Sequence, residues 1–154
     1  MEIKTAPIAS TAILIRQPIE EVFEAFVNPA ITANFWFTKG SGRLQVGKQI
    51  RWDWEMFKHT ELVTVKALEE NKRILIEWDS YGTLTLVEWA FVARSDNSTW
   101  VSIVNAGFAG TGDEIVQQAA DTMEGFVLVL AGAKAYLEHN IQLNLIADRF
   151  PDAH

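Results

Sequence analysis

The sequence predicts an α+β fold in which a single long C-terminal helix lies across one antiparallel sheet. About a hundred residues read as consecutive strands joined by short turns, two short helical segments follow the first strand, and a long apolar helical pattern comes near the end. Short connections make neighbouring strands antiparallel, so these strands are expected to share one sheet. A chain of 154 residues can bury one sizeable core, and we expect one domain over residues 1–154.

The first part of the chain is expected to form a strand and two short helices. Residues 8–16 are rich in β-branched and small side chains, as strands are. Pro18 suits the first turn of a helix, where its missing N–H would be unpaired anyway, and Asn28 ends this helix because a proline follows it. A second helical turn over residues 30–34 leads into the aromatic segment 35–37, which we expect to be exposed.

The middle of the chain is expected to supply six further strands, over residues 43–46, 48–56, 59–68, 73–79, 83–94 and 98–105. Gly47 and Gly82 lie at turns between them. Apolar and polar residues alternate within the strands, which defines one apolar face carrying four tryptophans. The helix predicted over residues 113–140 has an apolar stripe along one side, so we expect it to cover that face.

Composition excludes several classes of function. The net charge of −7 and the absence of any Lys/Arg cluster argue against nucleic acid or an anionic membrane surface as partner. No apolar run reaches the roughly 18 residues that a membrane span needs. There are 0 cysteines, so disulfides, a thiolate nucleophile and Cys-ligated zinc are ruled out. With no signal-peptide pattern at the N-terminus, we expect a cytoplasmic protein.

The six Trp and nine Phe residues are numerous for this length, and aromatic side chains both fill cores and line pockets for flat apolar ligands. Both interpretations stay open on the sequence alone. Asn105 is singled out because a polar amide on an inward face must find a hydrogen-bond partner in backbone, water or ligand. If the sheet and helix do enclose a pocket, its predicted lining is Trp36, Trp52, Trp54, Trp78, Trp89, Ile103, Asn105, Phe126 and Leu130.

No recognised catalytic motif occurs, and we predict no catalytic residues, no metal site and no cofactor. Asp53, Glu55, His59 and Glu61 lie across one predicted hairpin and could serve acid–base or metal chemistry. Such side chains are as common on a solvated face, and alternation places Asp53 and Glu55 opposite the tryptophans. We therefore favour a solvated surface for this group.

In order and spacing, several motifs together resemble a known family. They are a Pro-x-x-x-Val-Phe helix at residues 18–23, a proline and aromatic pair at Pro29 and Phe35-Trp36, a glycine before a strand at Gly47, an Arg-apolar-x-apolar-x-Trp strand at residues 73–78, a strand ending in Gly107-Phe108, and a Gly-aromatic helix at residues 125–138. The chain thus resembles the START-related (SRPBCC) superfamily. Within it, the chain is similar to the bacterial family like the C-terminal domain of the activator of the heat-shock chaperone ATPase.

This resemblance implies a helix-grip fold, also called START-like or birch-pollen-allergen-like, with a curved sheet of six to seven strands around the helix. It implies binding of a hydrophobic or aromatic small molecule between sheet and helix, with residues 35–37 at the mouth. Alternatives are a polyketide cyclase or hydratase-like enzyme using the same pocket, and a chaperone ATPase co-regulator. Phe126 stands where the family usually has Trp, and Ala133 where it usually has Leu, which either enlarges the pocket or is compensated by other tryptophans.

The tail over residues 141–146 is apolar enough to pack against another surface. We expect it to fold back on the sheet. If it instead covers a partner subunit, the protein is a homodimer.

Overall fold

One antiparallel sheet and one long helix account for most of the protein in the computed structural model, which describes residues 5–153. The elements in chain order are β1 (Ala9–Ile15), α1 (Ile19–Val27), α2 (Pro29–Thr32), β2 (Lys39–Gly40), β3 (Gln49–Trp54), the 3-10 turn η1 (Glu55–Phe57), β4 (His59–Glu69), β5 (Arg73–Ser80), β6 (Thr83–Ala93), β7 (Thr99–Ala106), α3 (Gly112–His139), α4 (Leu145–Arg149) and the 3-10 turn η2 (Pro151–Ala153). No helix in this part of the chain is long and apolar enough to cross a membrane.

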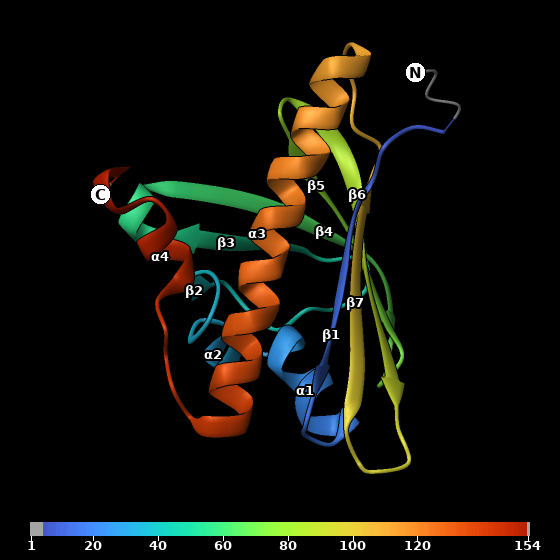
Figure 1. Ribbon diagram of the computed structural model, residues 1–154, viewed down its shortest axis with the longest axis vertical. Helices are drawn as coiled ribbons and strands as arrows, with labels where there is room; N and C mark the ends of the chain where they lie inside the picture. Colours follow the sequence, from blue (N-terminus) through green and yellow to red (C-terminus); the bar gives the residue numbers. More distant parts are fainter. Residues whose placement is uncertain (1–4, 154) are drawn as a thin grey trace.

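The seven strands form a single curved sheet in the order β1-β7-β6-β5-β4-β3-β2, with every neighbouring pair antiparallel. A register irregularity between Val65 and Ala67 interrupts the β4–β5 ladder, and such bulges bend a strand and increase its twist. The helix α3 runs across the sheet, while α1 and α2 lie at one end of it (Figure 1). This is the predicted helix-grip arrangement.

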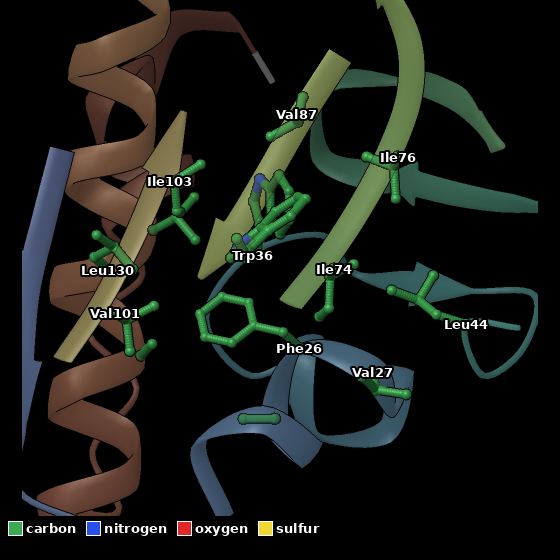
Figure 2. Packing of buried hydrophobic residues seen from close by; sticks show 14 of the residues in the cluster. Phe26, Val27, Trp36, Leu44, Ile74, Ile76, Val87, Val101, Ile103 and Leu130 are labelled. Carbon is green, nitrogen blue, oxygen red and sulfur yellow. The ribbon is translucent and has the colours of Figure 1, made fainter. Parts of the chain in front are cut away.

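The core lies between α3 and the sheet, as alternation in the strands predicts. Trp52, Trp54 and Trp89 are at most 7% exposed. Phe26 of α1 and Val101 of β7 point into the same interior as Trp36 (Figure 2). Filling of this space by large side chains from both layers agrees with the dense packing of protein interiors.

Two local predictions are wrong. Residues 43–46 form no strand, because the edge of β3 is already paired with Lys39–Gly40 and the following segment turns away to bury Leu44. The aromatic segment 35–37 is not exposed: Phe35, Trp36 and Phe37 are 8%, 7% and 1% exposed. In a turn, consecutive side chains point in different directions, and here all three find apolar surroundings on α3 or the sheet.

Both ends of α3 are capped. At the start, Thr111 Oγ1 accepts from the Glu114 N–H at 3.3 Å, and Glu114 Oε2 accepts from the Thr111 N–H at 3.4 Å. This reciprocal capping box pairs two N–H groups that a helix start leaves free. At the other end Asn140 adopts the left-handed conformation, with φ 55°, that commonly terminates helices.

The C-terminal part of α3 is fastened to the edge strand β1 by a partly buried ionic group. Lys134 Nζ donates to the Leu14 carbonyl at 2.7 Å and to Glu138 Oε2 at 2.6 Å. The same Glu138 oxygen accepts from the Arg16 N–H at 2.8 Å. Burial acts to raise the pKa of Glu138, but the Arg16 N–H and the Lys134 ammonium outweigh it, so this pKa lies below its ordinary value of 4.5.

We expect Glu138→Gln to lower the free energy of unfolding by about 1–2 kcal/mol at pH 7, because two charge-assisted hydrogen bonds weaken. A carboxyl whose pKa is depressed in the folded state stabilises above its unfolded pKa, and this stabilisation is lost as pH falls through the folded pKa. The difference between the two proteins should therefore be constant above about pH 6 and shrink below pH 4.5. Urea unfolding at several pH values measures it; Glu20→Gln, at an exposed position, is the control.

The tail folds back, but it lies along α3 rather than on the sheet. Gln142 Nε2 donates to Asn34 Oδ1 at 3.0 Å, which ties the loop after α3 to the α2 region. Ile146 packs against the main core, whereas Ile141 and Leu143 remain 49% and 45% exposed. Helix α4 then lies beside α3 near η1 and the end of β3 (Figure 1).

Candidate ligand-binding pocket

A pocket of about 290 Å³ lies between the middle of α3, the ends of β3 and β5, the start of β4, and the C-terminal helix α4. Most of its lining is apolar, and aromatic rings come from every side. The lining residues are Trp36, Trp54, Phe57, His59, Trp78, Asp121, Thr122, Glu124, Gly125, Phe126, Leu128, Val129, Ile146, Arg149 and Phe150.

The inner wall consists of rings that also belong to the core. Trp78 of β5 stacks on Phe126 of α3, with centroids 6.1 Å apart and planes 17° apart. Trp36 meets Phe126 edge-on at 6.1 Å and approaches Trp54 at 6.0 Å. Trp36 and Trp89 thus pack around Phe126. These tryptophans fill part of the space that is left because Phe126 replaces the larger Trp usual in the family. Trp36 is thus in contact with rings from both layers, the sheet and α3.

The outer wall is provided by the chain's last residues. Phe150 approaches Phe57 of η1 edge-on, with centroids 6.1 Å apart, and the Arg149 guanidinium lies 4.7 Å from the Phe150 ring centroid. Arg149 Nε donates to Glu124 Oε1 on α3, and this carboxylate raises the pKa of the arginine. An ion pair and an aromatic contact together hold α4 over the pocket.

Gly125 contributes open space on the helical side of the pocket. A Cβ atom built at this position would meet no atom within 4 Å, so helix packing does not require glycine here. Glycine inside a helix costs about 1 kcal/mol relative to alanine. By contrast, Gly132 on the same helix lies against the segment after α2, because a Cβ there would lie 3.3 Å from Phe35 and would require Phe35 to shift slightly.

Polar side chains lie mainly at the rim. His59 is half exposed and its Nε2 lies 2.8 Å from Glu61 Oε1, while its ring lies 5.8 Å from that of Trp54. Asp121 Oδ1 accepts from the Gln117 amide at 2.9 Å. The pocket therefore has an aromatic interior with charged groups where it opens to solvent.

The structure places four of the nine predicted lining residues at this pocket: Trp36, Trp54, Trp78 and Phe126. Trp52, Trp89, Ile103 and Leu130 belong to the closed core, where each is at most 2% exposed. Asn105 is also fully buried and absent from the lining. Alternation correctly identified the inward face, but only one end of that face borders the pocket.

Asn105 has its partners within the sheet. Its Nδ2 donates to Thr85 Oγ1 at 2.9 Å and to the Leu86 carbonyl at 2.8 Å, while no described residue donates to its buried Oδ1. The side chain links β6 to β7 away from the pocket. Its expected role is therefore structural.

We expect Asn105→Ala to lower the free energy of unfolding by about 1–3 kcal/mol, because two buried acceptors lose a donor. Ligand affinity should not change, since Asn105 does not line the pocket. Ser102→Ala, with its side chain on the other face of β7, is the matched control. Denaturant unfolding and ligand titration separate the two effects; a tenfold loss of affinity at unchanged stability would assign Asn105 to the ligand.

The acidic residues of the predicted hairpin lie apart from one another. Asp53 accepts from Thr60 Oγ1 at 2.6 Å and from Arg51 Nε at 2.9 Å, and both contacts lower its pKa. Of the four residues, only His59 reaches the pocket. Among residues 5–153, no group of three His, Asp or Glu side chains is arranged to hold a metal ion.

Sequence reasoning missed the pocket residues Phe57 in η1, Ile146 in the tail, and Arg149 and Phe150 beyond the tail. The apolar character of the tail was a usable signal, and it did indicate packing against another surface. Gly125 carried a second signal, because a glycine within an otherwise regular helical pattern requires a reason.

Comparisons with known proteins agree with the fold and identify the family. A protein of Staphylococcus saprophyticus, SSP2350, is 29% identical, with a TM-score of 0.76 over 88% of this chain and 95% of that one. The Aha1 dimer from Colwellia psychrerythraea is 18% identical, with a TM-score of 0.72 over 86% and 96%. DynU16, from the dynemicin biosynthetic locus, is 19% identical with a TM-score of 0.77 over 90% of this chain, which spans only 49% of DynU16.

No curated protein matches the sequence. The family model described as Activator of Hsp90 ATPase homolog 1-like protein matches residues 16–138, which include every strand after β1 and almost all of α3. The chain therefore belongs to the Activator of Hsp90 ATPase homolog 1-like protein family, within the SRPBCC superfamily.

Proposed function

We propose that the protein binds a small hydrophobic or aromatic molecule in the pocket between α3, the sheet and α4. One observation carries this proposal: an apolar space of about 290 Å³ stays unfilled beside rings that are otherwise densely packed. Gly125 supports it, because a larger residue would fill part of that space and would favour the helix.

The volume sets the expected size of the ligand. An engineered cavity of about 150 Å³ in another protein holds benzene. The pocket is about 290 Å³, roughly twice as large, so a ligand with about two fused rings fits it. Stacked and edge-on rings in the wall would favour a flat molecule.

Native mass spectrometry of freshly purified protein tests whether a ligand is retained. An adduct of up to about 300 daltons on the 17.3 kDa chain, lost on collisional activation, is expected if binding is tight. Titration with naphthalene derivatives, followed by the fluorescence of the pocket tryptophans, tests weaker binding. No adduct together with no saturable change for any two-ring compound would contradict the proposal.

A second candidate is an enzyme that moves a proton on a ligand in the same pocket, as in a cyclase or hydratase. The observation favouring it is the His59–Glu61 pair at the rim, because an imidazole oriented by a carboxylate is a common general base. For this candidate, His59→Gln should abolish turnover of a substrate while leaving its binding intact. Turnover unchanged by His59→Gln would rule out this residue as the base.

A further inference from the structure

We propose that the ligand is a small organic cation, with a flat apolar body among the pocket rings and an ammonium group at the rim beside Asp121. This inference rests on the proposed function and adds the charge of the ligand. It follows from the rings of the wall, the charges of the rim and the charge distribution along α3.

The wall is suited to a cation because six of its residues carry aromatic side chains, three of them indoles. The face of an aromatic ring is electron-rich, and indole attracts cations most strongly. At the rim, the Arg149 guanidinium already lies over the Phe150 ring, so the rings left for a ligand cation are those of the inner wall.

The ionisable side chains of the lining leave a net negative charge. Arg149 is paired with Glu124 and also interacts electrostatically with Asp121, so one guanidinium is set against two carboxylates and one negative charge is left over. Asp121 also accepts a hydrogen bond from the Gln117 amide, which carries no charge. His59 is paired with Glu61, and this pair adds either no charge or one further negative charge, according to the protonation of the histidine. In every case the rim is negative.

The surroundings reinforce this charge. Between residues 113 and 133, α3 contains Asp113, Glu114, Asp121 and Glu124 and no Lys or Arg. The whole chain has a net charge of −7, which attracts cations to the surface and repels anions. An anionic ligand could use Arg149 only by separating it from Glu124, which would leave that carboxylate facing the anion.

Three ligands with one two-ring body test the inference: 2-naphthylmethylammonium, 2-naphthylmethanol and 2-naphthoate. By calorimetry at low salt, the cation should bind at least about tenfold more tightly than the alcohol, and the carboxylate more weakly than either. The advantage of the cation should fall in about 0.5 M salt, because screening weakens interactions between exposed charges.

Asp121→Asn should reduce the affinity of the cation to that of the alcohol and leave the alcohol unchanged. Asp113→Asn removes the same charge from the first turn of α3, outside the pocket. It should leave the tighter binding of the cation over the alcohol nearly unchanged. If the alcohol binds as tightly as the cation to the unmodified protein, the inference is overturned and the binding function stands. If none of the three binds, the binding function fails for ligands of this size and the inference with it.

Discussion

Trp36→Ala should lower the free energy of unfolding by about 3–5 kcal/mol. Trp36 is 7% exposed and lies within 6.1 Å, centroid to centroid, of rings on β3, β5, β6 and α3. Removing the indole leaves a cavity at the point where the sheet, α3 and the segment after α2 meet. The surrounding large rings cannot collapse into it without losing contacts with one another.

Trp100→Ala is the matched control, because Trp100 lies on the outer face of β7 and is 43% exposed. Trp100→Ala should lower the free energy of unfolding by less than about 1 kcal/mol. Urea unfolding followed by circular dichroism measures both variants. Equal losses in the two would show that Trp36 does not link the layers, and Trp36→Phe, which keeps a ring, provides a milder variant if Trp36→Ala does not fold.

Gly125→Phe should abolish ligand binding, with an affinity loss of at least about 100-fold, because its ring would occupy the pocket. The backbone and neighbours leave room for the first side-chain atom, since no atom lies within 4 Å of the new Cβ. Gly125→Ala should instead stabilise the protein by about 0.5–1 kcal/mol, the usual gain on replacing glycine within a helix, and weaken binding only slightly.

Val127→Phe controls for this prediction, because it introduces the same ring on the solvent-facing side of α3, where Val127 is 46% exposed. Binding to this variant should equal that of the unmodified protein. Calorimetric titration with the tightest naphthyl compound measures both. Unchanged affinity in Gly125→Phe would place the ligand elsewhere in the molecule.

Strand alternation predicted the position of the core tryptophans because a strand's side chains alternate strictly between two faces. Residues such as Trp52 and Trp89 were therefore correctly assigned to the inward face. Alternation gives no information on where a helix leaves that face uncovered. Alternation therefore could not predict that Trp54 lines the pocket whereas Trp52 does not.

The tail was predictable only in part. Its apolar residues indicated packing, but the partners of Arg149 and Phe150 are far away in the sequence. Periodicity describes residues within one element and carries no signal for such pairs. The prediction that residues 35–37 are exposed was wrong for a related reason. Three aromatic residues in a turn show no periodic pattern, so their burial depends on the surfaces around them.

The contacts of Lys134 and Glu138 with β1 have a further consequence, for colloidal behaviour. A free sheet edge exposes unpaired N–H and C=O groups that can template the addition of a strand from another molecule. Here α3 side chains occupy the Leu14 carbonyl and the Arg16 N–H beside that edge, while the opposite edge strand, β2, has only 2 residues. The Leu14 end of β1 and the two-residue β2 therefore offer little template, so concentrated protein should resist edge-to-edge aggregation at these two places.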